Sequence, residues 1–509
     1  MKALSVEQSI LDGEKELKEL FKYVETDSKA LKAYDMEKVI YSRIMRIGLA
    51  AMKCYFAEKG TGDVGTELSL DDGTMLKKES TLRGRNYFSV FGKIKVPRTY
   101  YRGVGPAGVM PLDTLTDFPE RSYSYLLQEW MDTLSIRDSF KESEITLSKL
   151  LGLKVSSSRF EVVNRDTGKH YDKFYEEKKL PPSDSEGAIQ VVQFDGKGVP
   201  MIKKEAVKLK ARLGKGEKRQ KKKEAMVGVS YTVDRNKRTA EEVAENLIYP
   251  ERAKAKKEAH KKSDVIVLYP PKAQNIRRMA SLERTKKEVV EEIMGDAQKR
   301  NPDDKKPWVV VMDGALGLWN LVGKMFCGTD YVGIQDIIHV VEYLWIAGNA
   351  LIGDNDLKTD KWVYKKLLSI LQGNVGRVIG GLKQTLNKNR KLSKSKRDAI
   401  EKVIRYFENH SQWMNYDAYL KEGFPIGSGV VESTCGHTVK NRMEGTGRRW
   451  SIEGAESTLL LRSIYTSGDW EFYWEWHMKL ERRRLYGGVF KALGIADDYH
   501  TEITIKKSA

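Results

Sequence analysis

The spacing of apolar positions divides the chain into segments of different secondary structure. Over residues 1–60 apolar side chains recur every three or four positions, which predicts two helices that pack as a hairpin or as an oligomer contact. Residues 61–120 are richer in Gly, Thr and aromatic residues and partly alternate, which predicts a small β-rich module. Helical spacing returns over 121–185 and ends at a Pro-Pro-Ser-Asp-Ser linker.

The stretch 144–160 predicts a helix, a turn at Gly152 and a second helix that begins after serines. This is the arrangement of a helix-turn-helix, in which the second helix enters the major groove of DNA. Helical hairpins with a glycine turn that bind nothing are as frequent, so both interpretations stay open.

Two short apolar strands each lead into an Asp-Gly pair. The first covers 188–194 and is followed by Asp195, and the second covers 307–312 and is followed by Asp313. Strand ends that converge on one edge of a sheet place these two carboxylates side by side. Asp-Gly is also a frequent choice for an ordinary hairpin turn, so each pair taken alone has a structural explanation.

A long basic segment separates the first strand from its return strand at 225–233. The segment includes Lys218 and Arg219, and it predicts antiparallel strands joined by a basic hairpin that contacts the DNA backbone. A solvated loop is the alternative. A further apolar strand leads to Asp336 and His339, and the residues alone favour a capping or core role for this histidine.

A basic helical stretch, 353–424, precedes a turn that leads into Glu432. Glycines and a proline mark the turn, Ser428 is a candidate helix cap, and Glu432 falls in the first helical turn. An acid in that place often only complements the helix dipole. The residues that follow it suit contacts with phosphates and, for the tryptophan, stacking on an unpaired base: Lys440, Arg442, Arg448, Arg449 and Trp450.

The charge balance favours a polyanionic partner. The 509 residues include 89 Lys and Arg against 71 Asp and Glu, a formal net charge of +18. No apolar run reaches the ~18 residues of a membrane span, and early charges argue against a signal peptide. We therefore expect a cytoplasmic protein that binds DNA and no membrane. Three scattered cysteines indicate neither a disulfide framework nor a zinc site.

Three carboxylates together support a chemistry that none of them supports alone. Asp195 and Asp313 from strand ends, with Glu432 from a helix across the sheet, can hold two divalent ions. Such ions activate a water or a 3′-hydroxyl and stabilise the leaving oxygen of an in-line phosphoryl displacement. Carboxylate oxygens suit Mg²⁺ or Mn²⁺ better than zinc.

These motifs resemble those of bacterial insertion-sequence DDE transposases of the ISKra type. The similarity covers about 85–485, and its most specific part surrounds Glu432. It is carried by Phe194-Asp195-Gly196, Val311-Met312-Asp313-Gly314, Asp336-Ile337-Ile338-His339, and Gly427-Ser428-Gly429-Val430-Val431-Glu432-Ser433 followed by Lys440-Asn441-Arg442 and Gly447-Arg448-Arg449-Trp450-Ser451. Some related transposases carry paired cysteines near the N-terminus. This chain has none, which leaves the helix-turn-helix as the candidate for site recognition.

The resemblance implies an α/β fold with a ribonuclease-H-like mixed sheet flanked by helices and a helical insertion before the last catalytic acid. It implies Asp195, Asp313 and Glu432 as catalytic metal ligands, with Asp336 and His339 as accessory residues. The expected segments are 1–60, helical; 61–120, β-rich; 121–185, helical with the helix-turn-helix; 186–352, first part of the catalytic core; 353–424, basic helical insertion; 425–485, closing helix of the core and its exit; and 486–509, a tail.

The expected function is transposition, in which metal-dependent cleavage at the ends of an insertion element is followed by joining of the freed 3′-hydroxyl to target DNA. A homodimer or larger complex on nucleoid DNA is expected, because two ends must be brought together. A nuclease of the same fold without strand transfer, or a catalytically inactive domesticated DNA-binding protein, are the alternatives.

Overall fold

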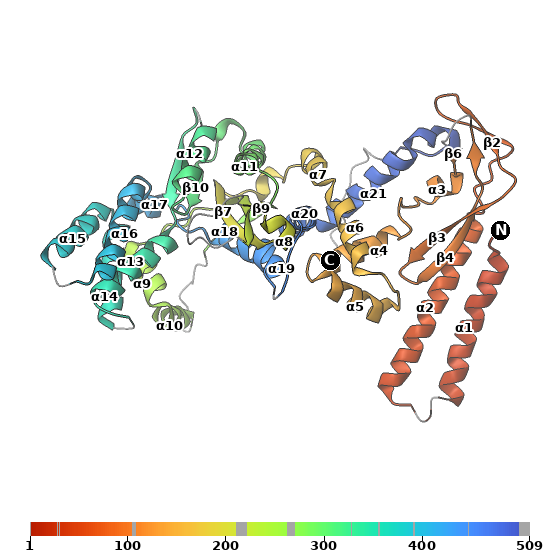
Figure 1. Cartoon of the computed structure of the whole chain (residues 1–509), viewed down its shortest axis with the longest axis horizontal. Coiled ribbons are helices and arrows are strands. Elements are labelled where there is room, and N and C mark those ends of the chain that lie inside the picture. Colours follow the sequence, from red (N-terminus) through yellow and green to blue (C-terminus); the bar gives the residue numbers. More distant parts are fainter. Residues whose placement is uncertain are drawn as a thin grey trace. The chain divides into compact units, whose positions relative to one another are not determined.

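The middle of the chain forms one structural unit, and the two ends of the sequence together form another (Figure 1). The first unit comprises Met1–Glu177 and Asp469–Ala509, and the second comprises Lys178–Gly468. The computed structural model describes residues 2–27, 29, 31–103, 108–209, 221–261, 270–326, 328–354, 357–389, 392–445 and 447–497, with only the backbone of 256–261. Lys218 and Arg219 of the predicted basic hairpin therefore lie outside the described residues.

Two long helices begin the first unit and pack against each other. They are α1 (Val6–Thr26) and α2 (Ala33–Glu58). The helices approach closely, since a Cβ on Gly13 would lie 3.5 Å from the Cβ of Ala50. Arg43 of α2 reaches Glu16 and Glu19 of α1 at N–O distances of 3.1 and 2.8 Å. The predicted helical hairpin is confirmed, while its use as an oligomer contact stays a prediction.

The strands of the first unit form two small sheets in the region predicted to be β-rich. One sheet has the strand order β1-β2-β5-β6, and the other is the β3-β4 hairpin. The strands are β1 (Glu67–Ser69), β2 (Met75–Lys78), β3 (Arg83–Ser89), β4 (Gly92–Arg98), β5 (Tyr101–Arg102) and β6 (Gly108–Val109). Ile94 and Val96 of β4 belong to one apolar cluster with Phe56 of α2 and Phe118. The β3-β4 hairpin thus shares a core with the helical hairpin.

Helices complete the first unit and include the predicted helix-turn-helix. They are α3 (Pro111–Leu115), α4 (Tyr125–Ser135), α5 (Phe140–Leu151), α6 (Ser157–Gly168), α7 (Tyr171–Glu177) and α21 (Trp470–Tyr486), followed by the short turns η6 (Gly487–Val489) and η7 (Lys491–Leu493). Helix α5 ends at Gly152, whose φ of 66° lies in the left-handed region, and α6 follows the N-cap Ser156. Phe160 and Val163 of α6 pack with Leu147 of α5. The two helices about a glycine turn are confirmed, and DNA contact by α6 stays a prediction.

A buried carboxyl group connects α4 to α6. Asp132 is fully buried and accepts a hydrogen bond from the Asn164 side chain at 3.4 Å. Burial raises the pKa of Asp132 to about 8, so the folded unit keeps this proton at neutral pH. The unfolded chain releases it near the ordinary aspartate pKa of about 3.9. Because the folded state binds the proton more tightly, this group lowers stability progressively as the pH rises from about 4 to about 8.

We expect Asp132 to reduce the free energy of unfolding by roughly 1 kcal/mol for each pH unit in that range. Asp132→Asn has the same shape and does not ionise, so this component of the pH dependence should disappear. Urea unfolding of the wild type and the variant, between about pH 5 and about pH 8, measures the difference. Parallel pH profiles for the two proteins would contradict the expectation.

A mixed five-stranded sheet lies at the centre of the second unit. Its strand order is β11-β10-β7-β8-β9. Strands β7, β10 and β11 are parallel neighbours, whereas β7 with β8 and β8 with β9 are antiparallel. The strands are β7 (Ile189–Pro200), β8 (Lys222–Val233), β9 (Gln274–Ser281), β10 (Trp308–Met312) and β11 (Tyr331–Gln335). The predicted antiparallel return strand is confirmed as β8.

Helices surround this sheet, and the region predicted to be a helical insertion is helical. The helices before it are α8 (Lys203–Ala206), α9 (Ala240–Ile248), α10 (Pro250–Lys261), α11 (Lys286–Arg300), α12 (Leu316–Met325) and α13 (Ile337–Leu351), with short turns η2 (Ser183–Ser185) and η3 (Pro302–Asp304). The insertion contains α14 (Leu357–Leu371), α15 (Val375–Lys388), α16 (Lys394–His410), η4 (Ser411–Trp413) and α17 (Tyr416–Glu422). After it come α18 (Gly429–Thr434), η5 (Cys435–Lys440), α19 (Asn441–Met443) and α20 (Ile452–Ser467). Within the described ranges, no helix combines the length and the apolar character needed to cross a membrane.

Helices α11 and α18 cover opposite faces of the sheet. Side chains alternate along a strand, so Gln193 and Phe194 of β7 point to opposite faces. Phe194 lies on the α11 side, because a Cβ on its cross-strand neighbour Gly228 would meet both Phe194 and Ile293 of α11. Gln193 instead bonds to α18. Asp195 shares the face of Gln193, and it therefore points toward α18.

Candidate active site

Three aspartates lie at the same level of the sheet, Asp195 on β7 and the other two directly after the neighbouring strands β10 and β11. The β7–β10 register pairs Val192 with Val310, and Asp195 and Asp313 each follow that pair by three residues. Asp336 directly follows the last residue of β11, which pairs with the residue before Asp313. The register therefore brings the two predicted aspartates side by side and adds Asp336 beside them.

The strand that carries Asp195 continues beyond it, and the prediction that it ends there is wrong. Strand β7 runs to Pro200 because β8 keeps pairing with it, and Asp195 stands opposite Val227. On the other side, the ladder between β7 and β10 stops at Val192. Asp195 thus lies where β7 and β10 have ceased to pair, next to the end of β10.

Glu432 comes from α18, which is tied to β7 by the buried side chain of Gln193. Oε1 of Gln193 accepts the N–H of Val431 at 3.1 Å, and its Nε2 donates to the Gly427 carbonyl at 3.2 Å. The first bond satisfies one of the N–H groups that a helix start leaves without an intrahelical partner. Ser428 occupies the N-cap position, as predicted, but its side chain makes no capping bond. The role of Gln193 was not predicted, and its one signal in the sequence is that it is one of two amides, with Gln190, inside an apolar strand.

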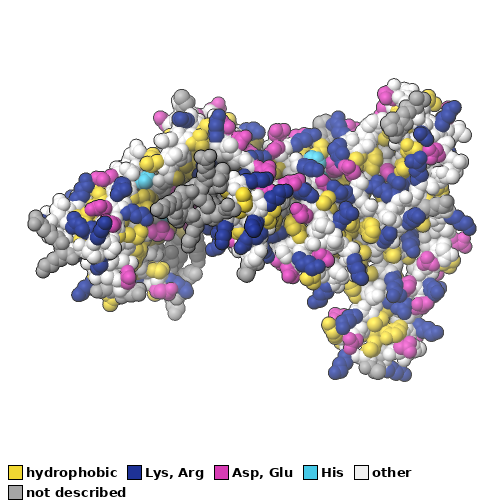
Figure 2. Space-filling view, viewed as in Figure 1, with side chains coloured by type: hydrophobic (Ala, Val, Ile, Leu, Met, Phe, Trp, Pro, Cys, Tyr) yellow, Lys and Arg dark blue, Asp and Glu magenta, His cyan; other side chains and the backbone are white. Residues whose placement is uncertain are grey.

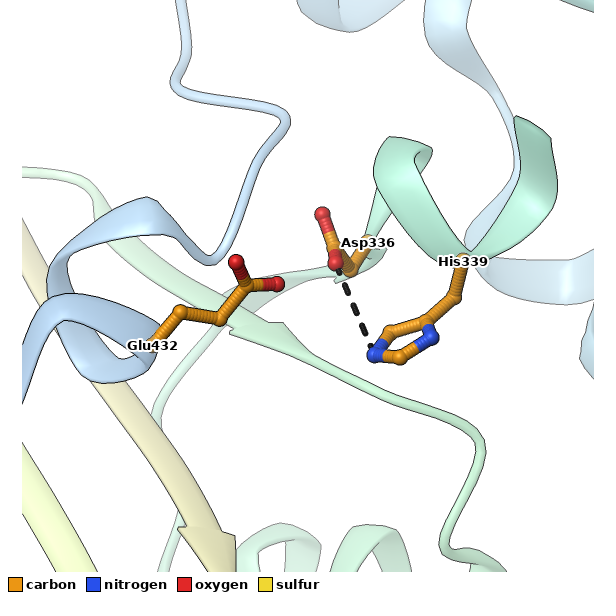
Figure 3. A group of neighbouring side chains, drawn as sticks. All are labelled: Asp336, His339 and Glu432. Carbon is orange, nitrogen blue, oxygen red and sulfur yellow. Dashed lines mark ion pairs between the residues drawn. The ribbon is translucent and has the colours of Figure 1, made fainter. Parts of the chain in front are cut away.

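Among the described residues, one group of three candidate cation ligands lies close together: Asp336, His339 and Glu432. One ligand atom of each lies within 4.8 Å of the others. Figure 3 shows Glu432 and His339 on either side of Asp336. Nε2 of His339 is 3.9 Å from Asp336, and its Nδ1 is 3.0 Å from Oε2 of Glu342. The His339 side chain is 33% exposed, so of the two predicted structural roles the core role is wrong, while the capping role stays a prediction.

Asp313 is coupled electrostatically both to His339 of this group and to Asp195. Burial and then the negative charge of Asp195 raise the pKa of Asp313. Burial opposes protonation of His339, but the charges of Asp336, Glu342 and Asp313 raise the pKa of the imidazole. Several negative groups therefore face one another here, which is the condition under which a bound cation stabilises the site most.

The π-helical segment η5 follows α18 and directs Cys435 toward Asp195. The Cys435 thiol donates to Oδ2 of Asp195 at 3.1 Å, and the N–H of Gly196 donates to Oδ1 at 2.6 Å. Single turns of π-helix occur frequently at functional sites. Both oxygens of Asp195 thus have a donor that fixes the carboxylate. Nothing in the sequence marks Cys435 for this role, because its partner lies 240 residues away.

We expect Cys435 to resist alkylation in the folded chain. Its side chain is almost fully buried, and burial, followed by the charge of Asp195, raises the pKa of the thiol. The reactive thiolate is therefore scarce. Iodoacetamide labelling with peptide mass spectrometry should show modification of Cys435 at least about tenfold slower in the folded than in the urea-unfolded chain. Equal rates in both states would contradict this burial.

The basic residues after α18 divide into exposed and buried groups. Lys440 and Arg449 are exposed, and Arg448 is half-buried with its guanidinium donating to the Arg442 carbonyl at 2.8 Å. Arg442 and Trp450 are only 1% and 6% exposed. The Arg442 guanidinium lies 4.5 Å from the centroid of the Trp450 ring. The predictions of phosphate contact by Arg442 and base stacking by Trp450 are wrong, because packing on each other removes both from solvent.

Lys and Arg side chains are spread over the visible face of the molecule and mixed with Asp and Glu (Figure 2). The net charge of +18 therefore does not by itself mark one DNA-binding surface. Comparison with known proteins adds no family, since no protein-family model and no curated protein matches this chain. Its function has to be inferred from the site and from the motifs that carry the resemblance.

Proposed function

We propose that the chain is a DDE transposase of an insertion sequence, which cleaves DNA at the ends of the element and joins the freed 3′-hydroxyl to target DNA. The observation that carries the proposal is the level position of Asp195 on β7 and Asp313 directly after β10, with Cys435 near both Asp195 and Glu432. The mixed sheet with β7 at its centre supports the ribonuclease-H-like fold that the resemblance implies.

The residues at the site suit divalent cations that prefer oxygen ligands. Asp195, Asp313 and Glu432 would hold Mg²⁺ or Mn²⁺, two ions for each site, with Asp336 and His339 as accessory residues. Burial and then repulsion from Asp195 raise the pKa of Asp313, and a cation would relieve that repulsion. When bound, the ions would supply activation of the attacking oxygen and stabilisation of the leaving oxygen.

The protein's own part in this chemistry is to hold the carboxylates in position. The thiol of Cys435 and the N–H of Gly196 fix the two oxygens of Asp195. Gln193 fixes the start of the helix that carries Glu432. Preorganised ligands of this kind avoid a reorganisation cost when the substrate binds.

The DNA contacts that we propose come from exposed basic residues and from the helix-turn-helix. Lys440 and Arg449 would bind phosphates, which orient DNA without reading its sequence. Arg159 is exposed on the first turn of α6, where a recognition helix contacts bases. Because two ends must be joined in one reaction, the working complex would contain at least two copies of the chain.

Incubation of the full chain with linear DNA that carries the sequences flanking its gene tests the proposal. We expect cleavage at the element ends with Mg²⁺ or Mn²⁺, none with EDTA, and joined products when a second DNA is added. Cleaved ends that never join would favour a nuclease of the same fold. DNA binding without cleavage in either cation would contradict the proposal that the chain is an enzyme and would favour a domesticated DNA-binding protein.

A further inference from the structure

A single hydroxyl group lies between two of the acids at the site. Oγ of Ser428 is 2.9 Å from Oδ2 of Asp336 and 2.8 Å from Oε1 of Glu432. A hydroxyl has one hydrogen and two lone pairs, so it donates to one carboxylate at a time. Ser428 is buried, and solvent does not compete for that hydrogen. The two carboxylates are therefore linked through one side chain.

Asp336 is held mainly by protein donors. Its Oδ1 accepts the N–H of Ile338 at 3.2 Å and the N–H of Ser428 at 3.1 Å, and its Oδ2 lies 2.9 Å from Oγ of Ser428. Two N–H donors occupy both lone pairs of Oδ1, and the Ser428 hydroxyl covers Oδ2. Asp336 is also fully buried. It joins the start of α13 to the turn before α18, and few of its ligand positions remain for a cation.

Unlike Asp336, Glu432 has few contacts with the protein. It is exposed, and the bond from Ser428 is the single hydrogen bond that the described residues provide to its carboxylate. In Figure 3 this carboxylate points toward Asp336. An exposed glutamate has several rotamers of similar energy, so the Ser428 bond selects one of them. Glu432 therefore has oxygens available for a cation but depends on Ser428 for its direction.

We propose that Ser428 is a positioning residue, which transfers the fixed position of Asp336 to the carboxylate of Glu432 and so directs Glu432 toward a divalent cation. The inference rests on the proposed function, because it takes Glu432 as a cation ligand. Asp336 acts through Ser428 and does not bind the cation itself. The hydroxyl is available for this role because Gln193, and not Ser428, bonds to the start of α18.

Mn²⁺ binding to the full chain, measured by electron paramagnetic resonance without DNA, tests the role of the hydroxyl. Ser428→Ala should weaken Mn²⁺ binding about 10- to 100-fold, the usual effect of losing a group that orients a metal ligand. Ser428→Thr keeps the hydroxyl and should retain most of the affinity. Ser433→Ala removes an exposed hydroxyl next to Glu432 and should bind Mn²⁺ as the wild type does. Unchanged affinity in Ser428→Ala would overturn the inference.

Asp336→Ala tests whether Asp336 positions Ser428 or binds the cation itself. If Asp336 acts through Ser428, the double variant Ser428→Ala/Asp336→Ala should bind Mn²⁺ no more weakly than the weaker single variant, because both changes remove the same link. Multiplied losses in the double variant would show that Asp336 binds the cation directly and would overturn the inference. Thermal unfolding checks that each variant is folded, and Ser428→Cys replaces Ser428→Ala if the alanine variant does not fold.

The same measurements distinguish this inference from the proposed function. Mn²⁺ binding with the expected pattern of variants, but without DNA cleavage by the wild type, would contradict the transposase and leave the role of Ser428 standing. A wild-type chain that binds no Mn²⁺ would overturn the inference, whatever DNA it binds or cleaves.

Discussion

Asp313→Asn should abolish DNA cleavage, lowering its rate at least about 1,000-fold, or about 4 kcal/mol in the activation free energy. The amide keeps the size of the carboxylate but lacks the charge that would hold a divalent cation opposite Asp195. DNA affinity should change little, because the expected phosphate contacts come from Lys440 and Arg449. Single-turnover cleavage and a fluorescence binding assay measure the two quantities separately.

Asp330→Asn is the matched control for this change. Asp330 is an exposed aspartate just before β11, and its replacement should leave both cleavage and binding at the wild-type level. Cleavage by Asp313→Asn near the wild-type rate would refute the assignment of Asp313. A parallel loss of DNA binding would instead indicate that the substitution damages the fold.

Trp450→Ala should lower the free energy of unfolding by about 3–5 kcal/mol, as expected for loss of a buried tryptophan. The indole is buried, packs under the Arg442 guanidinium and donates to the Met443 carbonyl at 3.1 Å. The backbone of Trp450 also bonds to Pro200 and Ile202, which connects the end of β7 to the start of α20. Chemical denaturation of the wild type and the variant measures the loss.

Trp450→Phe is the control that separates ring packing from the indole N–H bond. It keeps an aromatic ring in the core and should cost only about 1 kcal/mol. The folded Trp450→Ala chain should bind DNA as the wild type does, because a buried ring does not stack on bases. Weaker DNA binding with unchanged stability would restore the stacking role that the sequence suggested.

The sequence predicts those strands whose limits are set locally. Strand β11 lies where the apolar run 331–335 places it, since Asp336 ends the run and begins the next helix. Strand β7 outlasts its apolar run because β8 remains its partner up to Pro200. No apolar run predicts β9, because Arg277 interrupts it. That arginine is nevertheless buried, with Glu292 of α11 at 2.9 Å. In both cases a contact with another element, β8 for β7 and α11 for β9, explains why the strand differs from the prediction.

Some residues of the candidate site can also be predicted from the sequence, and others cannot. Asp195, Asp313 and Glu432 can be named from the sequence, because acids beside apolar runs are visible in it. The roles of Ser428 and Cys435 cannot, since each is defined by a contact to a distant strand or helix. Charge type is readable from sequence and burial is not. A buried basic residue such as Arg442 therefore looks like a DNA contact until packing is known.

The position of bound manganese tests the three-carboxylate site most directly. Crystals of the full chain grown with Mn²⁺ and a short duplex of element-end DNA would give anomalous difference peaks at the metal. We predict manganese bound by carboxylate oxygens of Asp195, Asp313 and Glu432, with Asp336 still bonded to Ser428. Manganese held by Asp336 and His339, with Asp195 and Asp313 making no contact to it, would contradict the account.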